Sequence, residues 1–202
     1  MPNHVFQRAE LTISDPEVRD NIIALATKGE SILKHYLPIA EEGTTQWHTA
    51  AIEMWGTKWA DYETTIIDDL EGDLVTVRFS SAWSPAEEGI AKLAALLDIH
   101  IVLEWEEEQP AFMGAAIFDG KQGRTWSRDY YDQGLDEALK RLGATEYPEE
   151  GDIDAINPET GLSPLDAFYQ NSSDAQSALR DEICNEMQEH LSKHIRWVSP
   201  IS

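Results

Sequence analysis

Two tryptophan-containing segments enclose a predicted β-hairpin, and this arrangement constrains the fold of the chain more than any other feature of its sequence. The segments are Trp55-Gly56-Thr57-Lys58-Trp59 and Ala82-Trp83-Ser84-Pro85. Residues 62–67 and 74–82 between them have an extended pattern, and an acidic turn that contains a glycine separates the two stretches, as is typical of paired strands. We therefore expect a helix, a hairpin and a second helix in this order.

Residue types at helix ends predict where the first helices begin and stop. Asp15 precedes a proline, which is typical of a helix N-terminus, and an apolar stripe continues over residues 16–27. A further helix is predicted at about residues 45–55, because Gly56 stands where a left-handed C-terminal residue is expected. After the hairpin, Ser84 is expected to cap the next helix in a reciprocal pair of hydrogen bonds with Glu87.

The remaining elements of the first part of the chain are predicted to be strands. Their expected positions are residues 4–14, 31–36, 99–105, 111–118 and 125–127. Strands, a helix, a hairpin, a second helix and further strands in this order predict an α+β fold, namely a ferredoxin-like antiparallel sheet with helices on one face.

A change of composition near Tyr130 divides the chain into two predicted parts. Residues 1–130 are expected to form the ferredoxin-like α+β domain, and residues 131–202 an acidic, mainly helical C-terminal extension. The extension contains a short predicted helix at 135–142 and a long one at 173–194. Apolar residues recur every four positions along the long helix, so this stripe can pack either on the sheet or on a partner.

Four residues of the tryptophan segments have two alternative interpretations. Trp55, Trp59 and Trp83 can line a ligand pocket in which Lys58 offers a cation beside an aromatic face or a contact to an anionic ligand. Alternatively, the large rings close the corner between helix and strand and fill the core. The second interpretation needs no ligand.

Negative charge dominates the composition. The chain has 38 acidic and 15 basic residues, a formal net charge of −23 and an isoelectric point near 4.4. Such a field repels nucleic acid and anionic lipid, so direct binding to either is not expected. The acids are unevenly distributed, because the chain from Leu142 to Leu179 contains no lysine or arginine.

This charge either aids solubility alone or presents a binding surface to a basic partner. For the second case the candidate partner-binding residues are Asp68, Asp69, Glu71, Asp73, Glu104, Glu106, Glu107, Glu108, Glu146, Glu149, Glu150, Asp152 and Asp154.

A family resemblance rests on the start of the chain and on both tryptophan segments. Met1-Pro2-Asn3 and these segments, with a looser match at Phe112-Met113-Gly114, resemble the YubB-type ferredoxin-like domain family of phage and plasmid proteins over about residues 1–128. Ala86 departs from the family, where a second proline is usual. The resemblance implies a ferredoxin-like fold and an origin in a mobile genetic element, and it implies no catalytic residue. It does not cover the extension.

No sequence motif supports catalysis. The chain lacks a Gly-x-Ser-x-Gly motif, a phosphate-binding loop and a dinucleotide fingerprint, and Cys184, the single cysteine, has no basic neighbour. We therefore predict no catalytic residue, no cofactor and no metal site. No apolar stretch is long enough to span a membrane, so the expected location is the cytoplasm of a bacterial host.

These observations favour a non-enzymatic phage or plasmid protein that inhibits a host factor. Arrayed carboxylates can imitate a phosphate backbone and occupy the basic nucleic-acid-binding groove of a defence nuclease or CRISPR effector. One alternative is a small-molecule or nucleotide-binding protein that uses the tryptophan-lined pocket. Another is an assembly module that forms a homodimer through the final helix.

Overall fold

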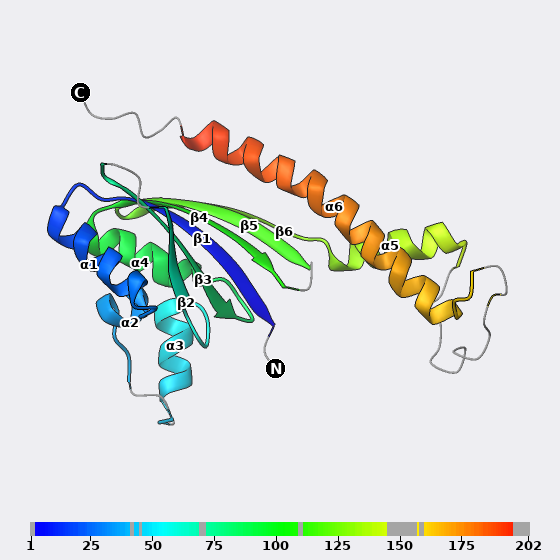
Figure 1. Cartoon of the computed structure of the whole chain (residues 1–202), viewed down its shortest axis with the longest axis horizontal. Coiled ribbons are helices and arrows are strands. Elements are labelled where there is room, and N and C mark those ends of the chain that lie inside the picture. The colour runs from blue at the N-terminus through cyan, green and yellow to red at the C-terminus, as the bar shows by residue number, and fades with distance from the viewer. Residues whose placement is uncertain are drawn as a thin grey trace.

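An antiparallel sheet of six strands, in the order β2-β3-β1-β4-β5-β6, forms the centre of the molecule (Figure 1). The computed structural model describes residues 3–40, 43, 44, 46–68, 72–108, 111–144, 157 and 160–195. The strands are β1 (His4–Thr12), β2 (Tyr62–Asp68), β3 (Leu74–Ala82), β4 (His100–Glu107), β5 (Phe112–Asp119) and β6 (Gln122–Asp129). The helices are α1 (Pro16–Thr27), α2 (Ile32–Tyr36), α3 (Trp47–Trp55), α4 (Glu87–Leu97), α5 (Tyr131–Leu142) and α6 (Pro164–Ile195).

The first four strands have the ferredoxin-like order. β1 lies between β3 and β4 and is antiparallel to both, while β2 forms a hairpin with β3. The connection through α1 joins β1 to β2, which have β3 between them. The connection through α4 joins β3 to β4, which have β1 between them. Both are split βαβ arrangements. β5 and β6 add two more antiparallel strands beyond β4. The predicted α+β class and ferredoxin-like sheet are confirmed.

The pleat of β1 separates an apolar face from a polar one. Val5, Ala9 and Leu11 are buried and belong to the main core, which fills the space between the sheet and α1–α4. Phe6 and Arg8 lie on the opposite face, because successive side chains of a strand point to opposite sides. The helices α1–α4 cover one face of the sheet, as predicted (Figure 1).

Helix α6 packs on the other face of the sheet. Two small apolar clusters hold it there, one around Val102, Ala115 and Met187, the other around Met113 and Ile183. In Figure 1, α6 crosses the sheet on the side away from α1–α4, and α5 lies beside its first turns. The apolar stripe of the extension is therefore used within the chain.

The predicted strand at 31–36 is wrong, because this segment is helix α2. Ser31 precedes the helix, and its hydroxyl accepts a hydrogen bond from the amide of Lys34 at 2.9 Å. Ile32 and Leu33 are both buried, which suits a helical turn, since neighbouring strand residues point to opposite faces.

The predicted cap of α4 is also wrong. Ala86, not Ser84, occupies the N-cap position, and no side chain caps the helix. The Ser84 hydroxyl instead donates to the carbonyl of Gly56 at 2.8 Å. Gly56 itself has φ +76° after the last turn of α3, as predicted for a left-handed C-terminal residue.

A network of buried hydrogen bonds joins the two tryptophan segments. The Thr57 hydroxyl donates to the carbonyl of Ala82 at 2.6 Å, and the amide of Ala82 donates to the carbonyl of Trp59 at 3.1 Å. Gln7 connects β1 to the same corner, because its side chain donates to the Ser81 hydroxyl at 2.7 Å and accepts from the amide of Ala86 at 3.0 Å. These bonds fix the hairpin, β1 and the start of α4 relative to one another.

A buried carboxylate holds α2 in place. Asp61 is 1% exposed, accepts a hydrogen bond from the amide of Leu33 at 2.9 Å and accepts a short one from the Ser31 hydroxyl. Burial raises the pKa of Asp61 to about 6, although these hydrogen bonds favour its ionised form. Folding therefore binds a proton at Asp61 at mildly acidic pH.

Thr57→Val should lower the free energy of unfolding by about 1 to 3 kcal/mol, because the buried carbonyl of Ala82 loses its hydroxyl donor. Urea denaturation would measure the change at constant m-value. Thr57→Ser retains the hydroxyl and is the matched control. A Val variant as stable as the Ser variant would contradict the role of this bond.

Asp61→Asn should change the pH dependence of stability. The folded-state pKa of Asp61 lies above its ordinary value, so its contribution to stability is greatest at low pH and is lost as the pH rises through about 6. Between pH 5 and 7.5 the wild type should lose about 1 kcal/mol relative to the Asn variant. Chemical denaturation at several pH values checks this, and parallel profiles for the two proteins would contradict it.

Candidate functional site

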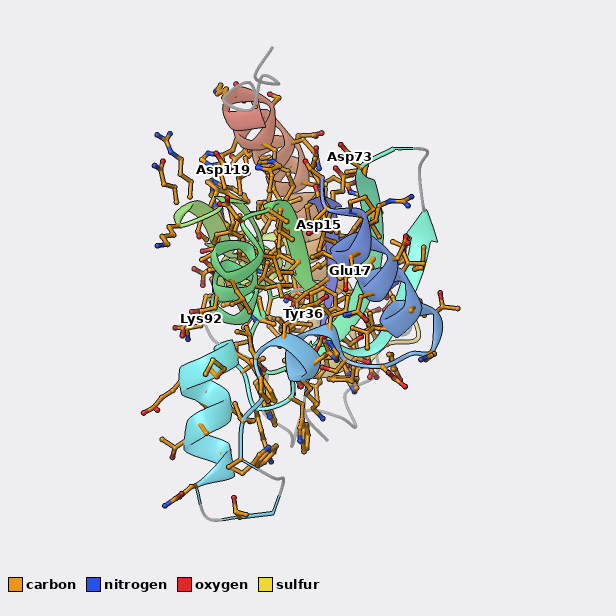
Figure 2. The ribbon with its side chains drawn as sticks, turned by 90° about the vertical axis from the view of Figure 1, so that its left-hand side faces the viewer. Asp15, Glu17, Tyr36, Asp73, Lys92 and Asp119 are labelled. Atoms are coloured by element: carbon orange, nitrogen blue, oxygen red, sulfur yellow. The ribbon has the colours of Figure 1, made fainter. Side chains whose placement is uncertain are left out.

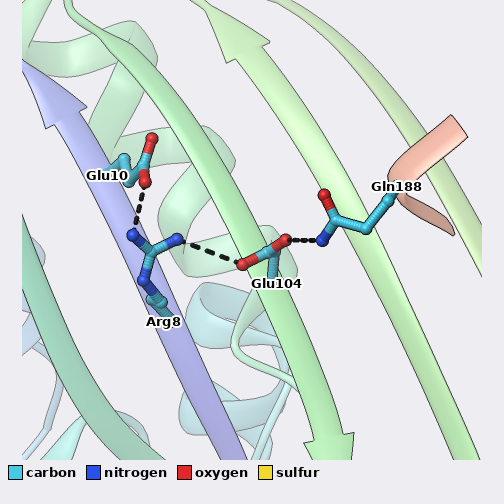
Figure 3. Close-up of polar contacts among 4 residues, drawn as sticks. All are labelled: Arg8, Glu10, Glu104 and Gln188. Carbon is cyan, nitrogen blue, oxygen red and sulfur yellow. Dashed lines mark hydrogen bonds and ion pairs between the residues drawn. The ribbon is translucent and has the colours of Figure 1, made fainter. Parts of the chain in front are cut away.

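The acidic residues at the end of β4 do not form one free surface. Glu104 lies on the face of the sheet that α6 covers, 20% of its side chain is exposed, and it forms an ion pair with Arg8 at 3.2 Å. The Gln188 side chain of α6 donates to the other Glu104 oxygen at 2.8 Å, and Arg8 also pairs with Glu10 (Figure 3). The charge of Glu104 is thus largely compensated within the protein.

Glu106 is held by an arginine of α6. The guanidinium of Arg180 binds both carboxylate oxygens of Glu106, one of them at 2.8 Å. These hydrogen bonds raise the pKa of Arg180 above its ordinary value. The bidentate geometry is the strongest form of such a pair, so Glu106 attaches the extension to the sheet.

Glu107 and Glu108, at the end of β4, lie beside the first described residues of the chain. Glu107 is buried and accepts a hydrogen bond from the Asn3 side chain at 2.8 Å. Glu108 is exposed and accepts from the amide of His4 at 3.3 Å. Of the four predicted glutamates, only Glu108 is thus exposed to solvent.

Many of the other predicted partner-binding residues lie outside the described residues. These are Asp69, Glu71, Glu146, Glu149, Glu150, Asp152 and Asp154. The backbone of Asp68 ends β2, opposite Thr76 of β3. Asp73 is exposed at the start of β3, and its carbonyl accepts from the amide of Ile13 at 2.7 Å.

Turns at one end of the sheet bring together exposed carboxylates from distant parts of the sequence. We call this set the acidic end, and it consists of Asp15, Glu17, Asp73, Asp98 and Asp119. All five residues are exposed, and none forms an ion pair with a residue that the structure describes. Figure 2 looks onto this end and labels four of them, on α1, before β3 and at the β5–β6 turn.

The backbone of the acidic end is tied together by hydrogen bonds between turns. The bond from Ile13 to Asp73 joins the start of α1 to the hairpin. The amide of Gly120 donates to the carbonyl of Ile99 at 3.3 Å, and this places the β5–β6 turn beside Asp98. Lys121 is an exposed base in the same turn.

The acidic end is also coupled to a partly buried histidine. Burial lowers the pKa of His100, and the nearby charge of Asp119 opposes this shift. The neutral imidazole therefore does not compensate the carboxylates at neutral pH.

Sequence reasoning identified only Asp73 of this set, although the signal for the others was present. Asp15 was predicted to begin a helix, and Asp119 lies in the turn before the last strand. In an antiparallel sheet, alternate turns lie at the same end. The predicted topology therefore implied that these carboxylates meet, which their spacing in the sequence does not reveal.

The four residues proposed to line a pocket have different environments. Trp55 is 1% exposed in the main core, and its indole donates to the carbonyl of Leu37 at 3.1 Å. The ammonium of Lys58 lies 4.3 Å from the centre of the Trp59 ring, a cation–π contact. Trp83 is 55% exposed and has φ +74°, a backbone conformation that is uncommon for large residues. Only Lys58 and Trp59 form a direct pair.

Among the described residues, no group of three or more His, Cys, Asp and Glu side chains is placed to hold a metal ion. The described helices include none whose length and hydropathy would let it cross a bilayer.

Comparison with known proteins identifies the domain. Residues 54–156 match the model of the ferredoxin-like domain in Api92-like proteins. One solved structure, the protein Api92 of Yersinia pseudotuberculosis, is similar at 19% identity and a TM-score of 0.37, over 44% of this chain and 32% of that chain. The chain thus spans about a third of Api92. No curated protein matches the sequence.

Arg180→Met should loosen α6 without unfolding the sheet. The pair with Glu106 is partly exposed, so its loss should cost no more than about 1 kcal/mol. Amide hydrogen exchange along α6 should accelerate while exchange in β1 and β3 stays unchanged. Lys193→Met, which breaks an ion pair within α6, is the matched control. Equal acceleration in both variants would contradict a specific attachment through Arg180.

Proposed function

The chain belongs to the family of Api92-like proteins that share this ferredoxin-like domain, and we propose that it is a non-enzymatic binding protein that inhibits a host nucleic-acid-binding factor. We further propose that it comes from a bacteriophage or plasmid and acts in the cytoplasm of the bacterial host. The acidic end would occupy the basic groove through which the target binds DNA or RNA. The observation that carries the proposal is the convergence, on one end of the sheet, of five exposed carboxylates that form no ion pair with the described residues.

Pre-organisation of these charges supports binding over a general role in solubility. Solubility depends on net charge and does not require carboxylates to be gathered on one surface. The turns that carry Asp73, Asp98 and Asp119 are held by backbone hydrogen bonds to neighbouring turns, so little conformational freedom is lost when a partner binds. Charges arranged in this way accelerate association with a surface of opposite sign.

The distribution of ion pairs also favours the acidic end over β4 as the contact surface. Glu104 and Glu106 are already paired with Arg8 and Arg180. A partner would have to break these pairs before it could use their charge. The carboxylates of the acidic end form no ion pair with the described residues, so a partner would have no such pair to break there.

A role in dimerisation through the last helix receives less support. The apolar stripe of α6 contains Ile183, Met187 and Leu191, which are buried against the sheet of the same chain. A partner helix would have to displace the sheet from this stripe. We therefore do not propose an assembly function.

Removal of charge at the acidic end should weaken capture of the target. In this experiment the full chain is immobilised and incubated with bacterial lysate, and captured proteins are tested for loss of DNA or RNA binding in a mobility-shift assay. The combined variant Glu17→Gln, Asp73→Asn, Asp98→Asn and Asp119→Asn should reduce affinity by about tenfold or more, and binding should weaken with salt.

The matched control removes the same number of charges elsewhere. Glu30→Gln, Glu53→Gln, Asp132→Asn and Asp174→Asn change exposed carboxylates outside the acidic end, and affinity should change by less than about threefold. Equal losses of affinity in the two combined variants would show that binding depends on net charge alone. Binding that does not interfere with the nucleic acid of the captured protein would contradict inhibition.

A further inference from the structure

A groove of about 250 Å³ lies between α6 and the part of the sheet that α6 leaves uncovered. Its lining combines apolar residues of the sheet and of α6, including Phe6, Met113 and Met187, with charged residues, namely Arg8, Arg78, Arg180, Glu104 and Glu106. It lies on the face of the sheet opposite α1–α4 and is separate from the acidic end.

Arg78 is the distinctive group in this groove. It lies on the open face of β3, directly opposite Arg8 of β1. Like charges in this position disfavour pairing of the strands, but Arg8 is neutralised by Glu10 and Glu104. Arg78 is exposed, and its side chain has no ion-pair or hydrogen-bond partner among the described residues, although the protein is strongly acidic.

The other charges of the groove compensate one another. Glu104 and Glu106 are bound to Arg8 and Arg180, so their pairs contribute little net field. Among the charged residues that line the groove, Arg78 is therefore the one that forms no ion pair with a described residue. Its fork of donors suits a carboxylate or phosphate group, which it can bind through two parallel hydrogen bonds.

Phe6 provides an apolar platform next to this charge. Phe6 is 48% exposed, although it lies on a central strand of the sheet. Phe6 lies opposite Ser80, two residues along β3 from Arg78, so both side chains lie on the same face of neighbouring strands. Met113 and Met187 bound the same space with flexible apolar side chains that adapt to a ligand.

We propose that this groove binds a small organic anion that carries a planar ring. The ring would stack on Phe6, and the anionic group would pair with Arg78. A groove of this size suits a ligand with a single ring system and one anionic group. The anionic group can be a phosphate, as in a nucleotide, or the carboxylate of an aromatic acid. This site is independent of the acidic end and of the proposed inhibition.

Calorimetric titration of the full chain with uridine monophosphate and with indole acetate distinguishes these two sources. At least one of them should bind, and uridine or inorganic phosphate alone should bind at least about tenfold more weakly, because each lacks one half of the ligand. Arg78→Gln should weaken binding by about tenfold or more. Phe6→Ala should weaken it by about threefold to tenfold, whereas Phe6→Tyr retains the ring and should bind like the wild type.

Lys121→Gln is the control for charge, since it removes one positive charge outside the groove and should leave affinity unchanged. Both Phe6 and Arg78 are exposed, so thermal unfolding of the variants should match the wild type. If Arg78→Gln does not fold, Arg78→Lys keeps the charge without the fork and should still bind more weakly. The proposal is overturned if neither anion binds, if Arg78→Gln and Arg78→Lys bind like the wild type, or if Lys121→Gln is equally impaired.

Discussion

The buried hydrogen-bond network around Gln7 and Thr57 is the interaction on which the rest of the structure depends. Gln7 belongs to β1, Thr57 follows α3, and Ser81 and Ser84 end the hairpin. Each hydrogen bond in this network joins elements that are distant in the sequence, and both Gln7 and Thr57 are nearly or fully buried. Buried polar groups of this kind tolerate only one arrangement, because every alternative leaves donors or acceptors unpaired. The network thereby orients the central strand, and the central strand orients both faces of the sheet.

The two faces of the sheet are stabilised by different physical means. One face is a broad apolar core in which Trp55, Leu33 and Leu93 pack between strands and helices. The other face has only small apolar clusters, and charged contacts such as Arg180 with Glu106 and Arg128 with Glu186 add to the attachment of α6. Salt therefore acts on the second face more than on the first.

The sequence predicts the sheet and most helices because their signals are local. The alternation in β1 and β3, the proline after Asp15 and the glycine after α3 each specify an element on their own. α2 was missed because its stability depends on Asp61, a residue far along the chain that accepts from its first turn. The start of α6 was placed too late, although Ser163 accepts from the amide of Asp166 and begins the helix. The groove could not be predicted, since it exists only where α6 crosses the sheet.

The docking surface of α6 makes the extension depend on the two strands that follow β4. This helix rests mainly on β4, β5 and β6, through Val102, Ala115 and Met113 and through the ion pair of Arg128. The last two of these strands lie outside the ferredoxin-like set of β1 to β4. Of the sheet contacts that hold α6, a variant without β5 and β6 would keep only those with β4, and it would expose much of the apolar side of that helix to water. The extension therefore depends on the added strands for its cover, whereas the core between the sheet and α1–α4 contains no described residue of α6.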